Sequence, residues 1–217
     1  MRPAWVCGRR GRGRRLAVGE LHFTNRNVLS KAASARVIVP EAVPGSFPVF
    51  YLLRGLPDDS MAWTRRTRID SHVEGRPPIA VMPDGERGFY AGSRSTPRAA
   101  FETDLGRDVI GLVDTAFPTI PERSGCVVGN PSVGGYGALR LALGHPDLTL
   151  AVVSHSGAVE FASPSWVGEE RRHWAVEYAP VFGEAPGAVP TTWSPSPSAS
   201  TGRRCQRCGS TAWWRPS

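Results

Sequence analysis

Cysteine and histidine are scarce in this chain of 217 residues, which contains four cysteines and five histidines. The cysteines, at positions 7, 126, 205 and 208, are scattered and give no disulfide framework, which favours a reducing, cytoplasmic location. No run of about eighteen apolar residues is present, so no membrane partner is predicted. Residues 1–15 lack the apolar segment of a secretory signal, so no export is predicted.

Acidic residues are absent from both ends of the chain. Residues 1–15 contain six arginines and residues 202–217 contain four, and neither stretch has an acid. These arginines outweigh the net charge of +7 of the whole chain, so residues 16–201 are mildly acidic. An arginine-rich arm that contacts phosphates is one interpretation of residues 1–15. A disordered leader, or translated sequence upstream of the true start, is favoured, and no nucleic-acid partner is predicted.

Periodicity is missing from the C-terminal part of the chain, which is rich in proline and serine and then in arginine. The predicted organisation is a basic disordered leader over residues 1–15, one incomplete α/β domain over residues 16–184 and a disordered tail over residues 185–217. Cys205 and Cys208 form one C-x-x-C pair in this tail, without a second pair or a nearby histidine. No metal and no cofactor is therefore predicted.

Between these ends, short apolar runs alternate with stretches of helical periodicity. Phe47–Leu53 and Pro78–Met82 are near-continuous apolar runs, typical of strands buried on both faces. The alternation predicts an α/β fold with a mostly parallel, doubly wound sheet. Further strands are predicted at Glu20–Arg26, Ser34–Pro40, Cys126–Val128 and Leu148–Val153. Helices are predicted at residues 60–73, with Ser60 as N-cap, and at 101–117, and residues 85–97 are predicted to form a surface loop.

Two expectations follow from this fold. The side chains of Phe50, Leu52, Val81, Val127 and Val152 should be buried in the sheet. Ligands of such sheets bind at the carboxyl ends of the strands, where Leu56, Asp84, Ser132 and His155 should gather.

The segment Cys126–Gly144, CVVGNPSVGGYGALRLALG, carries the strongest chemical signal. An apolar run leads through small residues to Ser132 and into a helical pattern with Tyr136, Leu139, Ala142 and Leu143 on one face. A strand, a tight turn with one serine and a helix make a nucleophile elbow, in which the turn exposes the serine hydroxyl. An ordinary Gly/Pro/Ser loop before a helix is the alternative interpretation.

With further segments in the same order, the chain resembles the esterase family of the α/β-hydrolases, which contains S-formylglutathione hydrolase, esterase D and the antigen 85 mycolyltransferases. The matching segments are YLLRGLPDDSMAW (51–63), VMPDG (81–85), FPTIPERSG (117–125), NPSVGGYGALRLALGHPDL (130–148) and SHSGAVEF (154–161). The resemblance implies an α/β-hydrolase fold with Ser132 as nucleophile and the N–H groups of Leu56 and Val133 as oxyanion hole. Loss of one such donor typically costs about 3 kcal/mol of transition-state stabilisation.

The chain departs from the family pattern at three places. Arg54 stands where a small residue or histidine is usual and is expected to crowd the oxyanion loop. Asn130 and Pro131 replace glycine and leucine in the elbow, which adds a side chain at a crowded position. In the family, the triad acid and then the triad histidine follow the HSG turn, which is His155-Ser156-Gly157 here. After this turn the only histidine of the chain is His173.

Neither His155 nor His173 is predicted to act as the base that activates Ser132. His155 matches the family's HSG turn, where it should satisfy backbone groups, and His173 is expected to be a solvated surface residue. One explanation is that the reading frame shifts after about residue 184, so that the last strands are missing. One choice of codons for QRCGSTA (206–212), read two nucleotides later, encodes Ala-Leu-Arg-Ile-Asp-Cys, a short strand ending in an acid.

The leading functional hypothesis is a serine hydrolase that acts on a small carboxylic ester or thioester through an acyl-Ser132 intermediate. The activity of the chain itself is in doubt because the base is missing. One alternative is an inactive truncated remnant, or a binding protein with a hydrolase fold. A second alternative is an acyltransferase of the mycolyltransferase type. The sequence does not indicate an oligomeric state.

Overall fold

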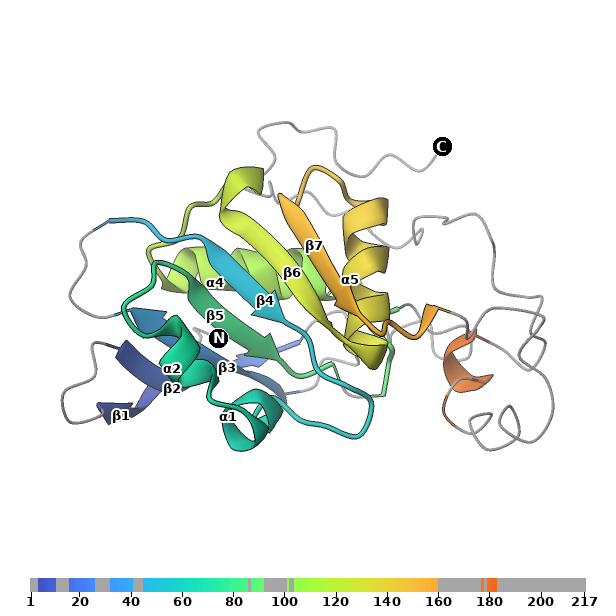
Figure 1. The fold of residues 1–217 in the computed structure, drawn as a ribbon, viewed down its shortest axis with the longest axis horizontal. Coiled ribbons are helices and arrows are strands. Elements are labelled where there is room, and N and C mark those ends of the chain that lie inside the picture. Colours follow the sequence, from blue (N-terminus) through green and yellow to red (C-terminus); the bar gives the residue numbers. More distant parts are fainter. Residues whose placement is uncertain are drawn as a thin grey trace.

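The computed structural model describes residues 4–10, 16–25, 32–40, 45–85, 87–91, 101, 104–159, 177 and 179–182. Its centre is a sheet that has seven strands among these residues, in the order β1-β2-β3-β5-β4-β6-β7 (Figure 1). The strands are β1 (Ala4–Arg10), β2 (Leu16–Thr24), β3 (Ala32–Pro40), β4 (Val49–Leu52), β5 (Ile79–Pro83), β6 (Cys126–Pro131) and β7 (Ala151–His155).

The sheet has an antiparallel part and a parallel part. β1, β2 and β3 pair antiparallel, and β3 joins β5 in the same sense. β5, β4, β6 and β7 run parallel, as the alternation of strands and helices predicts. Their carboxyl ends therefore lie at one edge of the sheet, which is where ligands of such folds bind.

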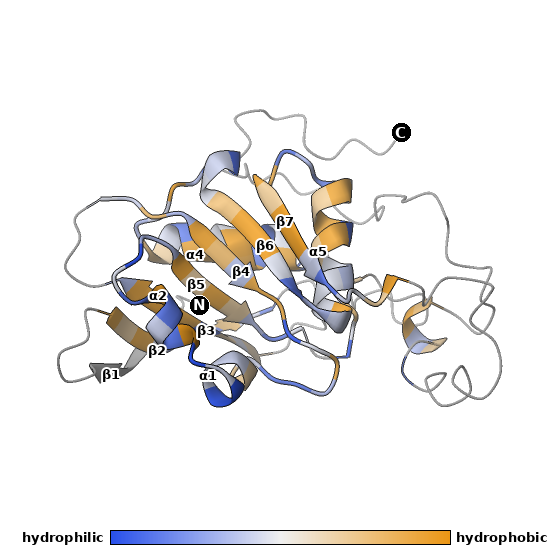
Figure 2. Cartoon of the chain, viewed as in Figure 1, coloured by the Kyte–Doolittle hydropathy of each residue, from blue (hydrophilic) through white to orange (hydrophobic). Residues whose placement is uncertain are grey.

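Helices cover the two faces of the sheet and form two separate cores. On one face, η1 (Asp104–Val109), α4 (Ile110–Ala116) and α5 (Ser132–Gly144) pack on the strands, with Val37, Tyr51 and Val128 in that core. On the other face, α1 (Ala62–Arg66) and α2 (Ile69–Val73) pack on a smaller core that contains Ile38, Leu52 and Met82. β4 and β5 are correspondingly apolar along most of their length, whereas β6 becomes polar at its carboxyl end (Figure 2).

The strand nearest the N-terminus differs from the sequence-based expectation. Residues 4–10 were predicted to belong to a disordered leader, but they form β1 and pair with β2 from Ala4 opposite His22 to Arg10 opposite Ala17. The backbone groups of these residues are therefore hydrogen-bonded to β2, although the arginine-rich composition had indicated disorder. The other residues of the predicted leader, and the predicted tail over residues 185–217, lie outside the described residues.

The predicted helix over residues 60–73 is two short helices instead. α1 ends at Arg66 and α2 begins at Ile69, because Thr67 between them is extended with φ −132° and ψ 174°. Ser60 is not the N-cap, since α1 begins after Met61. The Met61 N–H donates to the Asp59 carboxylate at 2.9 Å. The N-cap is therefore Met61, which makes no side-chain capping bond, and the Asp59 carboxylate binds the backbone just before the helix.

Two burial predictions are also corrected. Phe50, Val127 and Val152 are half-buried, whereas Leu52 and Val81 are buried as predicted. Val152 lies on β7, the last described strand of the sheet. Part of the predicted surface loop at residues 85–97 is buried: Phe89, Tyr90 and Ala91 all belong to the larger core.

The buried face of α5 differs from the predicted one. Leu143 was expected on the apolar face, but its side chain is 77% exposed. Gly134, Ala138 and Leu141 are buried instead, at the spacing of one helical face. The two glycines of the first turn fix this rotation, because they bring the helix backbone against the ends of β6 and β7.

Candidate functional site

Ser132 lies at a sharp turn between β6 and α5. Its φ angle is +56°, in the left-handed region that a serine rarely adopts, and its side chain is exposed. A backbone held in this region costs on the order of 1–3 kcal/mol and recurs at functional sites. The strand, the strained serine and the helix reproduce the elbow layout predicted from the sequence.

The side chain of Asn130 is accommodated by Gly134. A Cβ atom on Gly134 would lie 2.7 Å from Asn130 Cβ and 2.9 Å from Asn130 Nδ2, so only glycine leaves room here. Gly134 is the second glycine of the Gly-x-Ser-x-Gly elbow pattern, and its missing side chain leaves room for the one that Asn130 adds at the first position. Both polar atoms of the Asn130 amide are buried without a hydrogen-bond partner in the described part of the chain.

The turn that follows β7 is bonded to the elbow. The Ala158 N–H donates to the Ser132 carbonyl at 3.0 Å. A Cβ atom on Gly135 would lie 2.7 Å from Ser154 Oγ and 3.0 Å from the Gly157 Cα. The first turn of α5 therefore contacts the residues that follow β7 almost backbone to backbone, which fixes the position of Ser132 relative to the sheet.

The loop after β4 lies beside the same elbow. The Leu53 N–H donates to the Gly129 carbonyl at 3.1 Å, and the Arg54 carbonyl oxygen would lie 2.9 Å from a Cβ on Gly134. Within the described residues the Leu56 N–H has no acceptor. The Val133 N–H belongs to the first turn of α5, where backbone donors have no partner within the helix.

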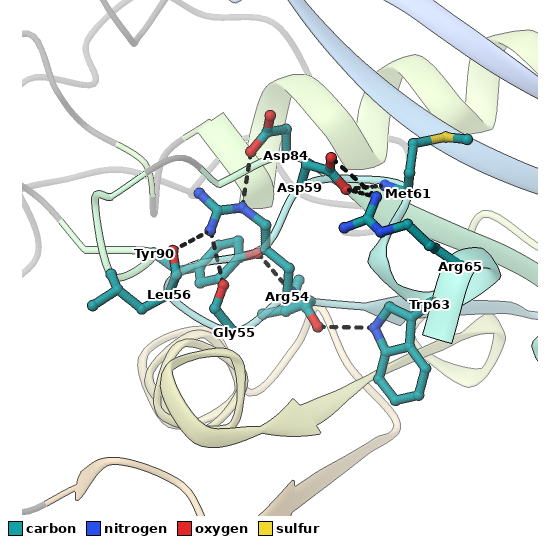
Figure 3. Close-up of polar contacts among 10 residues, drawn as sticks. Arg54, Gly55, Leu56, Asp59, Met61, Trp63, Arg65, Asp84 and Tyr90 are labelled. Atoms are coloured by element: carbon teal, nitrogen blue, oxygen red, sulfur yellow. Dashed lines mark hydrogen bonds and ion pairs between the residues drawn. The ribbon is translucent and has the colours of Figure 1, made fainter. Parts of the chain in front are cut away.

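Arg54 does not crowd this loop, contrary to the prediction. Its side chain is only 4% exposed and turns towards Asp84, whose carboxylate accepts from Arg54 Nε at 2.8 Å. Arg54 Nη1 also donates to the carbonyls of Gly55 at 2.8 Å and Leu56 at 2.9 Å (Figure 3). The guanidinium therefore satisfies carbonyls of its own loop and is neutralised by the residue that follows β5.

Tyr90 and Trp63 complete the polar contacts of the loop. The Arg54 N–H donates to the Tyr90 hydroxyl at 2.8 Å, and Trp63 Nε1 donates to the Leu53 carbonyl at 3.2 Å (Figure 3). Burial raises the pKa of Tyr90 well above its usual value near 10.0, although Arg54 opposes the shift. The phenol therefore stays protonated at neutral pH.

The described residues place no base against Ser132. His155 lies beside the elbow, because its Cα pairs with that of Pro131, but its side chain is exposed and makes no hydrogen bond to Ser132. The expectation that His155 satisfies backbone groups is wrong. His173 lies outside the described residues. Among the described residues no group of three His, Cys, Asp or Glu side chains could hold a metal, and no helix could span a membrane.

The predicted gathering of residues at one edge of the sheet is thus largely confirmed. Arg54 reaches Asp84, its carbonyl lies beside the first turn of α5, and Pro131 pairs with His155. Tyr90 was missed, because it stood in a segment whose glycine, serine and arginine content indicated a surface loop. Its aromatic neighbour Phe89 was the one signal of burial in that segment.

Comparisons with known proteins agree with this geometry. The family model "Putative esterase" matches residues 27–188. An acetyl esterase of Caldicellulosiruptor saccharolyticus is 25% identical over 75% of this chain and 64% of its own length. Esterase Rv1288 of Mycobacterium tuberculosis is 33% identical over 52% of this chain and 25% of its own length. The chain thus spans less than two thirds of these relatives.

Solved structures show the same fold at low identity. The serine hydrolase FphF of Staphylococcus aureus superposes with a TM-score of 0.66 at 19% identity, over 88% of this chain and 69% of that one. S-formylglutathione hydrolase of the same organism superposes with a TM-score of 0.62 at 19% identity, over 79% of this chain and 71% of that one. The family match covers the segment that builds the elbow, the solved structures share the α/β-hydrolase fold, and the chain belongs to the esterase family.

Proposed function

We propose that Ser132 is the nucleophile of an acyl-transfer site that acts on small carboxylic esters or thioesters. The observation that carries the proposal is the position of Ser132, exposed at φ +56° between β6 and α5 and beside the loop after β4. The relatives named as esterases and the family match support the same chemistry.

In the proposed reaction the Ser132 oxygen attacks the carbonyl carbon of the substrate while its proton passes to a base. The carbonyl oxygen becomes an oxyanion, which the N–H groups of Leu56 and Val133 stabilise. The bond to the leaving group then breaks, and the leaving alcohol or thiol takes a proton. Water hydrolyses the acyl-Ser132 ester and releases the acid, or a second alcohol accepts the acyl group.

We further propose that the base is missing from this site as it stands, because no described histidine bonds to Ser132. In a related triad enzyme, loss of the base costs about a millionfold in turnover. The chain alone should then hydrolyse p-nitrophenyl acetate barely above background. A non-enzymatic remnant or binding role is the competing proposal that the same observation favours.

Free imidazole separates these two proposals. In its presence, the rate of p-nitrophenyl acetate cleavage by the chain, minus that of the Ser132→Ala variant at the same imidazole concentration, should rise with imidazole. Equal rates for both proteins at every concentration would contradict the role of Ser132 and favour the non-enzymatic remnant. Strong Ser132-dependent turnover without imidazole would instead show that the chain contains its own base, and His173→Ala would test that residue.

A further inference from the structure

We propose that the ion pair between the buried Arg54 and the partly exposed Asp84 sets the direction of the Leu56 N–H and so positions one of the two oxyanion donors. The role of the Leu56 N–H as an oxyanion donor rests on the proposed function. The structural part, that Arg54 fixes the orientation of one peptide unit, can be tested without any activity.

The peptide unit between Gly55 and Leu56 carries the proposed oxyanion donor. This unit is trans, so its C=O and its N–H point in opposite directions. The Gly55 carbonyl accepts from Arg54 Nη1 at 2.8 Å and from the Asp58 N–H at 3.2 Å. With the oxygen held on the side of the guanidinium, the Leu56 N–H is directed away from it.

The next peptide unit is held in the same way, because the Leu56 carbonyl accepts from the same Nη1 at 2.9 Å. One guanidinium nitrogen therefore bridges two consecutive carbonyls. The third bond, from Nε to the Asp84 carboxylate, fixes the plane of the guanidinium to the end of β5. A loop that would otherwise rotate about its glycine is thereby bonded to the neighbouring strand.

The rest of the loop contributes further restraints, because the Asp58 N–H donates to the same Gly55 carbonyl and the Leu56 side chain is buried in the larger core. The Leu53 carbonyl accepts from Trp63 Nε1, and the Arg54 N–H donates to the Tyr90 hydroxyl (Figure 3). Among the described contacts, Arg54 Nη1 is the side-chain donor that reaches the peptide unit carrying the Leu56 N–H. Arg54 therefore acts through Leu56 and is a positioning residue.

Lysine cannot reproduce this arrangement, although it keeps the charge. The three bonds leave from Nε and Nη1 of a planar guanidinium, whereas an ammonium group has a single nitrogen. The Arg54→Lys variant therefore distinguishes geometry from charge. A double variant, Arg54→Met with Asp84→Asn, removes the pair without leaving a buried charge and protects the test against misfolding.

The first measurement is the backbone order parameter of the Leu56 amide from ¹⁵N relaxation. It should be about 0.85 in the unmodified chain and fall below about 0.6 in Arg54→Lys and in the double variant. Arg65→Met is the matched control, because it removes the exposed ion pair with Asp59 near the other end of the same loop. That control should leave the Leu56 value unchanged. Full rigidity of Leu56 in both Arg54 variants would overturn the proposal.

The second measurement is the affinity of phenylboronic acid. The Ser132 oxygen adds to boron, its proton is released to solvent, and the tetrahedral boronate places an oxygen where the oxyanion would lie. Both Arg54 variants should bind the boronic acid about tenfold to hundredfold more weakly. This is somewhat less than the loss of catalytic rate that follows removal of a whole oxyanion-hole donor. Arg65→Met should not change the affinity.

The two measurements separate the two proposals. If the unmodified chain and Ser132→Ala bind the boronic acid equally, the proposed function fails, and the order parameter of Leu56 still decides the role of Arg54. If binding depends on Ser132 but Arg54→Lys binds as well as the unmodified chain, the proposed function stands and the positioning role of Arg54 is wrong.

Discussion

The side chain of Asn130 occupies the space that a side chain at position 134 would need, and residue 134 is a glycine. A Cβ atom on Gly134 would lie 2.7 Å from Asn130 Cβ and 2.9 Å from the Arg54 carbonyl oxygen. The pair explains how an elbow without the usual glycine before its serine still forms. It also gives a direct test of the packing.

The Gly134→Ala variant should be destabilised by about 1–3 kcal/mol, because the added methyl group overlaps backbone as well as side-chain atoms. Urea unfolding of the variant would measure this loss. In the double variant Gly134→Ala/Asn130→Gly, part of the loss should be recovered. Gly111→Ala in α4 is the control, since its Cβ meets nothing within 4 Å and should be neutral or stabilising. Equal losses at both glycines would contradict this packing.

Replacing Asn130 by alanine should change the free energy of unfolding by no more than about 1 kcal/mol. The buried amide has no hydrogen-bond partner in the described part of the chain, so its removal leaves no partner unsatisfied and relieves its own desolvation cost. Chemical denaturation of Asn130→Ala checks this. A loss of several kcal/mol would mean that the amide is bonded in solution.

The buried phenol of Tyr90 should make the fold sensitive to alkali. Its pKa is raised in the folded state, so the stability that depends on the protonated phenol is complete below about pH 10, the ordinary pKa of tyrosine. That stability is lost as the pH rises from there towards the folded-state pKa. Unfolding free energies measured between about pH 8 and 12 should fall more steeply for the unmodified chain than for Tyr90→Phe.

The same Tyr90→Phe variant should be less stable near pH 8, by about 1–3 kcal/mol, because the buried Arg54 N–H loses its acceptor. The two pH curves should therefore approach each other under alkaline conditions. Parallel curves would show that Tyr90 titrates equally in the folded and unfolded chain.

Two leucines of α5 test its corrected orientation. Leu141 is 1% exposed, so Leu141→Ala should cost about 2–5 kcal/mol. Leu143 is 77% exposed, so Leu143→Ala should stay within about 0.5 kcal/mol. Thermal or urea unfolding of the pair gives the answer, and a large loss at Leu143 would support the face predicted from the sequence.

The sequence predicted the parallel strands, the elbow and the gathering of residues at one edge of the sheet, because each has a local signal in apolar runs or small residues. The sequence-based predictions were wrong where contacts between residues far apart in the chain determine burial or side-chain direction. The rotation of α5 depends on how its glycines meet β6 and β7, and the burial of Tyr90 depends on the Gly137 backbone beneath its ring. The direction of the Arg54 side chain depended on Asp84, which follows a different strand.

The pairing of β4 with both β5 and β6 has a kinetic consequence. Val49 lies opposite Ile79 and opposite Cys126, so the strands that support Ser132 come from distant parts of the chain. Closing such long loops costs chain entropy before the contacts form, so folding of this topology is slow. During refolding, we expect the β2–β3 ladder to form early and Ser132 to acquire its strained backbone only when the parallel strands have assembled. Its hydroxyl should therefore become chemically distinct from other serines in the last folding phase.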